Sequence, residues 1–546
     1  MTDPVRARLP KEEKLMSPDH SGSDELSRRR ILQFGGAGAF LLASGGLLAA
    51  CSSNGTTTAP TTGGAGGTPR RGGVLRIAAS GGGPADTIDL HNPLTSTDIA
   101  RVWQLADPLA RQNPVTGVSE LFLAEELTPN ADFTAWTVKI KKGVLLHNGR
   151  EFTSDDVLAT FQRIYDPKAP TQGAAVMPEL DAANIKVVDK YTLTLPMKRP
   201  FNNVLDALAG YFFMMVGRGY DIKNPIATGP FKFKSFTPGD RSVFVRNDAY
   251  WISGKPYVDQ IETINYADES SQVNALATGE VQLADLLSSA SIDALTGAGA
   301  QVVISPSAQW NPIFMRTDLA PFKDVRVRQA FRLMADREEM NQLVIGGKGQ
   351  VGNDIWSPND SIYDKSIPQR VQDIAQAKSL LSAAGQSGLT LDFPVADIAS
   401  GVVSMSQVFV QQAAKAGVTL NLKKQSVSDF FSSSYGASPI AVSFWYNQAY
   451  LVTSSLNAVT GAPFNETHFS DAKYDSLYGQ AMTTKDNVLK TEIGHEMQKI
   501  DYETGGEIIP FFNPSIDAAA KNVGGLIPCA NGLPLSGFDF SSFWME

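Results

Sequence analysis

The amino-terminal segment constrains the fold most strongly, because it predicts an export signal that contributes nothing to the folded body. Residues 27–32 read SRRRIL, which matches the Ser-Arg-Arg-x-apolar-Leu pattern of twin-arginine signals, with Arg28 and Arg29 as the twin arginines. The apolar run 34–50 contains five glycines and is too short for a membrane-spanning helix, which needs about 20 strongly apolar residues. The alternative interpretation is an uncleaved anchor helix. We expect the globular body to begin after this segment.

Cys51 follows Leu-Ala-Ala at 48–50, and this sequence resembles the lipobox of bacterial lipoproteins. There the cysteine thiol receives a diacylglyceryl group, and cleavage follows on its amino-terminal side. We therefore expect 1–50 to be a signal peptide and Cys51 to hold the chain at the extracytoplasmic (periplasmic or extracellular) face of the cell membrane. Residues 51–72, rich in Ser, Thr and Gly, are expected to form a flexible tether. An ordinary cysteine is the alternative.

Bulk composition excludes several classes of protein. Without residues 1–50, 496 of the 546 residues remain, enough for two or three domains. The net charge is −9 without a basic stripe, so we expect no nucleic-acid partner. Lipidation of Cys51 would leave Cys529 alone and exclude an intramolecular disulfide. The five histidines show no metal-ligand spacing, so no metal or cofactor is predicted.

Apolar periodicity predicts strands and helices that are mixed without strict alternation. Predicted strands lie at 135–140, 186–189, 191–195 and 241–246. Thr153 and Asp156 form a capping box ahead of an apolar helical stripe. Asp324 is predicted to cap a helix over 325–339, and a second amphipathic helix spans 373–384 and ends at Gly385. These patterns favour an α/β body with more than one lobe.

Four sequence blocks in a fixed order then identify a resemblance over nearly the whole mature chain. They are WTVKIKKGV at 136–144 with HNG at 147–149 and FT to DV at 152–157; ATGPF at 227–231 with PG at 238–239, RN at 246–247, YW at 250–251 and PYVD at 256–259; AL at 275–276 with GE at 279–280; and PFKDVRVRQA at 321–330 with DR at 336–337. The chain resembles family 5 solute-binding proteins of ABC importers, the dipeptide, oligopeptide and nickel-binding group.

This resemblance implies a two-lobed α/β fold of the large periplasmic-binding-protein type (class or cluster C), with the ligand held between lobes that close about a hinge. Lobe I would comprise 73–310 plus 500–546, with an extra subdomain at 98–219, and lobe II would comprise 311–499. The expected function is capture of a peptide-like or other small solute and its delivery to an ABC permease and its ATPase. We expect a monomer.

The resemblance also places a ligand-binding stretch at 443–450. Peptide binders of the family hold the peptide's ammonium group with an acidic residue shortly after a Gly-Trp pair, and Gln448 occupies that position here. Because an amide cannot replace a carboxylate in a charge-assisted pair, an ordinary peptide ligand is in doubt. Trp445, Tyr446 and Tyr450 can instead stack on a sugar ring or another flat or apolar solute, or fill the core.

Trp310 and Arg316 complete the candidate ligand contacts, because they lie at the expected entry to lobe II. Arg316 either faces the cleft and pairs an anionic group or is a solvated surface side chain. A nickel chelate held through His468 is a further possibility that one histidine supports weakly.

Two other functional classes remain as alternatives. A secreted hydrolase is disfavoured, because the sequence contains no Gly-x-Ser-x-Gly, His-Glu-x-x-His or strand-linked Gly-x-Gly-x-x-Gly motif. We therefore predict a protein that is not an enzyme. A solute or pheromone sensor that uses the same cleft cannot be separated from a transporter subunit by sequence.

Overall fold

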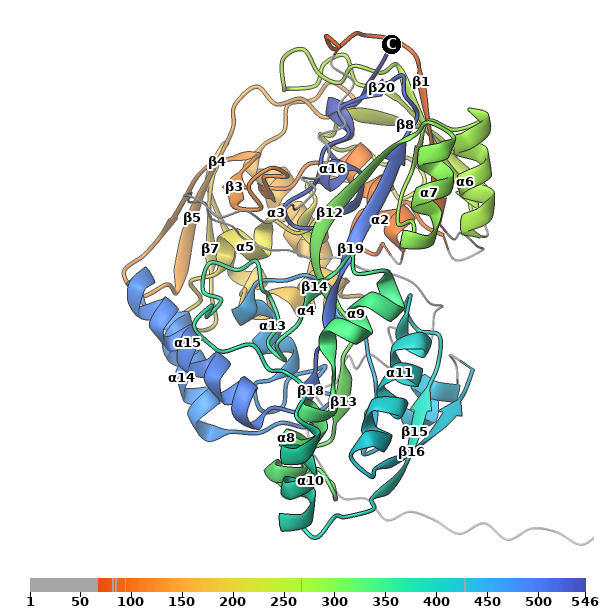
Figure 1. Cartoon of the computed structure of the whole chain (residues 1–546). Helices are drawn as coiled ribbons and strands as arrows, with labels where there is room; N and C mark the ends of the chain where they lie inside the picture. Colours follow the sequence, from red (N-terminus) through yellow and green to blue (C-terminus); the bar gives the residue numbers. More distant parts are fainter. Residues whose placement is uncertain (1–66, 81–82, 84–85, 94, 267, 427–428) are drawn as a thin grey trace, which may run out of the picture.

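The computed structural model describes residues 67–546 except 81–82, 84–85, 94, 267 and 427–428 (Figure 1). The predicted twin-arginine signal, Cys51 and most of the predicted tether lie outside the described residues. In the part of the chain that is described, no helix has the length and apolar character that crossing a membrane requires. Cys529 is buried and carries a free thiol.

The largest sheet organises the upper body in Figure 1 and has the order β12-β19-β11-β1-β10-β9-β8, with β14 paired to β19. Its strands are β1 Val74–Ser80, β8 Phe231–Thr237, β9 Arg241–Arg246, β10 Gln260–Tyr266, β11 Leu283–Ala284, β12 Gln301–Trp310, β14 Gln350–Val351 and β19 Phe511–Ala519. Strand β1 runs parallel to β10 and β11, so the three strands end at one edge of the sheet.

Helices cover both faces of this sheet, as the alternation of side chains along β1 requires. Leu75 and Ile77 join the core under α2 (Ser96–Leu105), whereas Ala78 joins a separate cluster under α6 (Glu269–Thr278) and α7 (Ile292–Gly297). The chain's last segments, α16 (Pro534–Phe538) and the β20–β21 pair (Val523–Gly524, Trp544–Met545), return to this body.

A second, antiparallel sheet has the order β4-β5-β7-β6. Its strands are β4 Ala124–Pro129, β5 Ala135–Ile140, β6 Lys186–Asp189 and β7 Thr192–Pro196. The hairpin β2–β3 (Ala110–Gln112, Ser119–Leu121) and helices α3 (Ser154–Ile164), α4 (Gln172–Val176) and α5 (Val204–Leu208) accompany it. The predicted capping box is confirmed, because the Asp156 carboxylate accepts the Thr153 N–H at 3.0 Å.

The lower body in Figure 1 has its own core around the three-stranded sheet β17-β13-β18 and the parallel pair β15–β16. These strands are β13 Ile313–Met315, β15 Thr390–Val395, β16 Thr419–Lys424, β17 Ile440–Val442 and β18 Glu507–Ile508. Around them lie α8 Val325–Met334, α9 Arg337–Ile345, α10 Ile374–Ala383 and α11 Val402–Lys415. The helices α13 Tyr450–Asn457, α14 Ala472–Thr483 and α15 Asn487–Thr504 complete the lower body, where α15 contacts α8, and their apolar side chains also join the core cluster of the upper body.

The chain passes from the upper to the lower body between β12 and β13 and returns between β18 and β19, while β14, which follows α9, pairs with β19 beside these two crossings. Because β14 and β12 both pair with β19, the crossing segments are hydrogen-bonded to one another on the upper side. We call these crossing segments the hinge.

One predicted helix is wrong in its length. Asp324 caps a helix as expected, and its carboxylate accepts the Arg326 N–H at 2.9 Å, but α8 ends at Met334 rather than continuing to residue 339. Ala335 is extended, with ψ of 113°, and Asp336 then caps a separate helix, α9. The apolar spacing continues from the first helix into the second, so the spacing alone does not reveal the interruption at Ala335.

Candidate functional site

The candidate segment 443–450 leaves β17 and passes directly beside the hinge. Trp310 and Trp445 exchange backbone hydrogen bonds, with N···O distances of 3.0 and 2.8 Å. Their indole rings stack with centroids 5.8 Å apart and an interplanar angle of 11°. This pairing fixes the segment against the strand that enters the lower body.

Each of the two stacked indoles donates its N–H to a buried carboxylate. Trp445 Nε1 donates to Glu466 Oε1 at 2.9 Å, and Trp310 Nε1 donates to Glu507 Oε2 at 3.2 Å. The Tyr435 hydroxyl donates to Glu466 at 2.5 Å. Burial and the charge of Glu466 raise the pKa of Glu507 well above the usual range of a glutamate.

A cavity of about 350 Å³ opens on one side of the segment, at the edge of the large sheet where β1, β10 and β11 end. We call it the sheet-edge cavity. Its lining comes from both bodies and the hinge: Glu269, 286–289, Gln309, Asn311, 344–345, 399–400, 444–446 and 513–516. No lysine or arginine lines it among the described residues, and Glu269 already accepts hydrogen bonds from Ser288 and Ser291.

Hydrogen-bonding groups of the sheet-edge cavity are mostly amides and hydroxyls. Asn311 Nδ2 of the hinge donates to the Ser400 carbonyl at 2.9 Å. The Ser515 hydroxyl is buried and has no hydrogen-bond partner among the described residues. An uncharged polar solute with a flat face next to Trp445 and Tyr446 fits such a lining.

A second cavity, of about 310 Å³, lies on the other side of the segment, between the small antiparallel subdomain and helices α13 and α14. We call it the helix cavity. Its lining is Gln112, 175–176, 178–179, Arg199, Phe201, Asn203, 206–207, 448–449, 451–452, 455–456, 459–463, Tyr478 and Met482. Gln448 Oε1 is buried here without a hydrogen-bond partner among the described residues. Glu179 and Arg199 neutralise each other as an ion pair.

Contacts between the two bodies flank the helix cavity. Asn447, which lies between the two cavities along the chain, donates its side-chain N–H to the Asn531 carbonyl at 2.7 Å. Asn202 Nδ2 of the small subdomain donates to the carbonyls of Ala481 and Thr484 at 2.9 Å each. The helix cavity is therefore flanked by segments of the two bodies that touch each other.

The six predicted ligand residues fall into three different environments. Trp445 and Tyr446 line the sheet-edge cavity, and Gln448 lines the helix cavity. Trp310 is fully buried in the hinge, where it packs on Trp445 and Phe512. The first three thus remain candidate contacts, whereas Trp310 can act only through Trp445.

Tyr450 and Arg316 line neither cavity. Tyr450 is the first residue of α13 and points into the core, where it stacks on Trp356 at 5.5 Å and donates its hydroxyl to Asp501. Arg316 donates to both carboxylate oxygens of Asp318, at 2.7 and 2.6 Å. Arg316 is therefore neutralised within the protein and largely buried, with 11% of its side chain exposed.

His468 also lies near this ion pair, with Nδ1 3.6 Å from Asp318. Among the described residues, no group of three His, Cys, Asp or Glu side chains is arranged to hold a metal ion.

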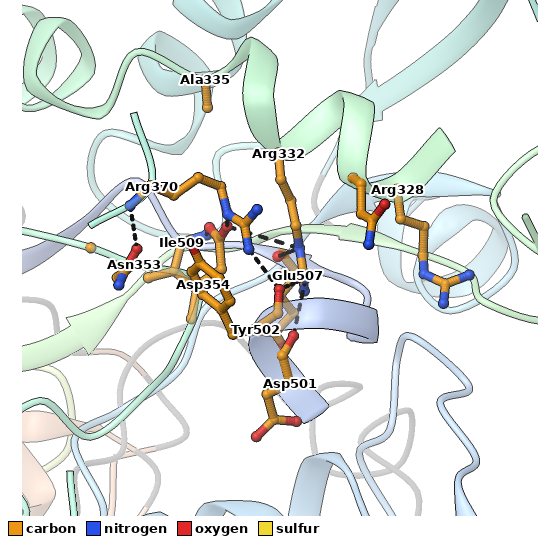
Figure 2. Close-up of polar contacts among 12 residues, drawn as sticks. Arg328, Arg332, Ala335, Asn353, Asp354, Arg370, Asp501, Tyr502, Glu507 and Ile509 are labelled. Atoms are coloured by element: carbon orange, nitrogen blue, oxygen red, sulfur yellow. Dashed lines mark hydrogen bonds and ion pairs between the residues drawn. The ribbon is translucent and has the colours of Figure 1, made fainter. Parts of the chain in front are cut away.

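Behind the cavities, the hinge contains a cluster of charged side chains around Asp354 (Figure 2). Arg337 Nη2 lies 2.7 Å from both carboxylate oxygens, and Arg370 Nε lies 2.9 Å from Oδ2. Arg332 approaches to 3.9 Å, and the Ile509 N–H donates at 2.9 Å. Burial acts to raise the pKa of Asp354, but the three arginines outweigh it and hold the pKa below its usual value.

Arg332 connects this cluster to the crossing strand. Its guanidinium donates to the carbonyls of Glu507, Asp501 and Tyr502 at 2.9, 3.0 and 2.8 Å. These carbonyls belong to the end of α15 and the start of β18, so one buried side chain of α8 holds both in place.

Comparison with known sequences agrees with the expected family. The model of bacterial extracellular solute-binding proteins, family 5 Middle, matches residues 120–464. Di/tripeptide-binding protein 2 of Pseudomonas aeruginosa is 25% identical over 458 residues, covering 77% of this chain and 85% of the relative. Glutathione-binding protein GsiB of Salmonella typhimurium is 25% identical over 446 residues, covering 77% and 84%.

Solved structures share the architecture. The ABC transporter substrate-binding protein CtaP from Listeria monocytogenes superposes with a TM-score of 0.76 at 21% identity, covering 87% of this chain and 100% of CtaP. DppA from Helicobacter pylori, in complex with the peptide STSA, gives 0.74 at 20% identity, covering 87% and 99%. At these identities the structural similarity establishes the two-lobed α/β fold. The family model matches residues 120–464, more than half of the chain, and therefore shows that this protein is a member of the family 5 bacterial extracellular solute-binding proteins.

Proposed function

We propose that the chain is the lipid-anchored substrate-binding subunit of an ABC importer, which captures a peptide-like or other small solute between its lobes and delivers it to a permease. The observation that carries the proposal is the position of segment 444–449, which contributes lining to two cavities bounded by both bodies. A solute that touches both lobes stabilises the closed state by its higher affinity for that state. The names of the matched relatives describe binding proteins for di- and tripeptides and for glutathione, which are solutes of suitable size.

The proposal divides the chain as the family resemblance implies, with lobe I at 73–310 plus 500–546, the extra subdomain at 98–219 and lobe II at 311–499. It also assigns Arg28 and Arg29 to twin-arginine export and Cys51 to lipidation. The tether at 51–72 would then keep a soluble binding body close to its permease.

Native mass spectrometry of the protein purified from its own host tests solute capture. We expect a solute that is released on unfolding and that, added back at about 100 times its dissociation constant, stabilises the protein by about 2.7 kcal/mol. Conversion of the added solute to a product would overturn the binding role in favour of an enzyme. Co-purification of a permease and an ATPase is expected, and their absence with a signalling partner present would indicate a sensor.

The anchor is tested separately by Cys51→Ser. We expect this variant to leave the membrane fraction and to remain folded and able to bind the solute, because Cys51 lies outside the binding body. Arg28→Lys with Arg29→Lys is expected to block export and leave the precursor in the cytoplasm. Retention of the Cys51→Ser protein in the membrane would count against the lipid anchor.

A further inference from the structure

Two side-chain amides of the hinge strands line the sheet-edge cavity without a protein partner. Gln309 of β12 and Asn513 of β19 are directly opposed in the antiparallel pair, so their side chains lie on the same face of the sheet. Both residues are half-buried and line the cavity, whereas the next pair, Trp310 and Phe512, is buried in the core. Within the described residues, neither amide takes part in a side-chain hydrogen bond. The hinge therefore offers adjacent donors and acceptors to the cavity.

A half-buried carboxylate adds a third polar group to the same cavity. Glu269, the first residue of α6, accepts the Ser288 N–H and hydroxyl at 2.8 Å each through Oε1, and the Ser291 hydroxyl donates to the same oxygen. Its Oε2 takes part in no hydrogen bond or ion pair in the part of the chain that is described. One carboxylate oxygen thus holds the side chain in place and the other remains an acceptor.

The amides and the carboxylate are spread along one strand. The Leu287 N–H donates to the Ile516 carbonyl at 2.9 Å, which fixes the loop that carries Ser288 to β19. Ile516 is three residues beyond Asn513, about 10 Å along an extended strand. The two kinds of polar group therefore contact different parts of one solute.

The lower body contributes aromatic rings to this cavity. Phe444 and Tyr446 are half-buried and line it, and their rings meet edge to face with centroids 5.5 Å apart. Trp445 between them is buried and stacked on Trp310, so it supports this boundary from behind. Aromatic side chains pack well against a flat apolar face of a solute.

Ring hydroxyl groups match this combination of side chains. A hydroxyl both donates and accepts, as the two amides do, and it can donate to the carboxylate of Glu269. An anionic group would meet the charge of Glu269 and no lysine or arginine among the described lining residues. The terminal carboxylate of a peptide has the same disadvantage. The C–H face of a sugar ring suits the aromatic boundary.

We propose that the sheet-edge cavity binds a neutral carbohydrate, with Gln309, Asn513 and Glu269 as partners of its hydroxyl groups and the aromatic pair against its ring. This inference rests on the proposed solute-binding function and names the chemical class of the solute. The volume of about 350 Å³ lies at the lower end of the range for small-molecule sites. Because the hydroxyl partners belong to the hinge and upper body and the rings to the lower body, such a solute would favour closure.

A glycan array of neutral and acidic mono-, di- and trisaccharides, probed with the full mature chain at pH 7, tests the inference. We expect binding to neutral saccharides and at least 10-fold weaker binding to acidic ones, because the acid group finds no cation. The dissociation constant of the strongest neutral saccharide is then measured by isothermal titration calorimetry.

Three single variants assign that saccharide to the cavity. Gln309→Ala and Asn513→Ala should each weaken binding about 2- to 10-fold, as expected for neutral hydrogen bonds. Glu269→Gln should weaken it about 10-fold, because a bond to a charged acceptor is stronger, while its amide oxygen can still accept from Ser288. Gln376→Ala is the matched control, since Gln376 is an exposed residue of α10 that lines neither cavity, and it should leave the affinity unchanged.

The urea midpoint of each variant shows whether the fold is kept, and three separate positions ensure that one unstable variant does not decide the outcome. Failure to bind any neutral saccharide, equal or tighter binding of acidic saccharides, or an affinity that all three substitutions leave unchanged would overturn the inference. A different solute retained from the host would in each case leave the proposed binding function intact.

Discussion

Three buried carboxylic acids lie close together in the hinge region: Asp354 on one side, and Asp501 and Glu507 on the other. Their surroundings compensate the carboxylate charge in different ways. Asp354 is surrounded by three arginines and a backbone N–H, whereas Asp501 and Glu507 accept hydrogen bonds from neutral phenol, indole and amide groups. The arginines keep the pKa of Asp354 low, while burial raises the pKa of Asp501 to about 8. All three are buried, so the partner decides which carboxylate stays charged.

The difference gives the two groups different roles. An ionised aspartate among arginines fixes geometry over the whole physiological pH range, and Arg332 carries that geometry to the backbone of α15 and β18. Carboxyls with raised pKa values instead gain or lose protons near neutral pH. A rigid anchor and a titratable pair therefore meet at the same crossing strand.

The largest expected effect comes from breaking the anchor with Asp354→Asn. Three buried arginines would lose their counter-charge, and breaking a buried pair in this way typically costs about 3–5 kcal/mol. We expect the urea midpoint of unfolding to fall accordingly. Asp240→Asn is the matched control, because Asp240 also contacts an arginine, Arg241, through both carboxylate oxygens, but at the surface, where such a pair contributes about 0–1 kcal/mol. Equal losses in the two variants would contradict the role of burial.

Because the pKa values of Asp501 and Glu507 are raised, we expect the free energy of unfolding to fall as the pH rises from 6.5 to 8. The native state holds protons on Asp501 and Glu507 that the unfolded chain has already lost above pH 5, so the free energy of unfolding declines until the native pKa is passed. We expect a loss of about 1–3 kcal/mol over this interval.

The interval begins at 6.5 for a physical reason. Burial lowers the pKa of His91 and His147 to about 4, so below pH 6.5 their protonation in the unfolded chain would act in the opposite direction. Urea unfolding at fixed salt measures the slope. A flat profile from 6.5 to 8 would mean that both acids are ionised in the native protein.

Glu507→Gln sharpens the comparison by removing one titrating group while keeping its shape. The amide can still accept the indole N–H of Trp310, which lies 3.2 Å from Oε2 in the native protein. We expect about half of the pH dependence to disappear and the stability at pH 8 to rise by about 1 kcal/mol, because a buried charge is no longer formed. Unchanged pH dependence would assign the titration to the other buried acids with raised pKa values, Asp501 and Asp517.

The smallest expected effect is that of Tyr450→Phe. It removes the phenol that donates to Asp501 while leaving the stacked ring on Trp356 in place. We expect a loss of about 1 kcal/mol, typical of one hydrogen bond, and an upward shift of the pKa of Asp501 because a donor to its charged form is gone. Solute affinity should not change, since Tyr450 lines neither cavity. A clear loss of affinity would return Tyr450 to the ligand contacts.

Local structure could be predicted where the determining side chains are neighbours in sequence. The strand at Ala135–Ile140 follows from alternation, and the caps at Thr153 and Asp324 follow from spacings of a few residues. The family resemblance extended this to the two-lobed architecture. The interruption at Ala335 cannot be predicted from the apolar pattern, because that pattern continues across it.

The candidate site could be predicted only in part. Trp445, Tyr446 and Gln448 lie in one segment and were found through the family motif, but the segment contributes to two cavities rather than one. Glu507 gives no sign in the sequence that it is buried.

The stacked indoles of Trp310 and Trp445 have an optical consequence. Two nearly parallel chromophores with centroids 5.8 Å apart couple their electronic transitions, and the coupling depends steeply on separation and on the angle between the rings. One ring belongs to the strand entering the lower body and the other borders the sheet-edge cavity. The exciton signal of this pair in circular dichroism is therefore a built-in reporter of how the two rings reorient when a solute enters or the lobes move.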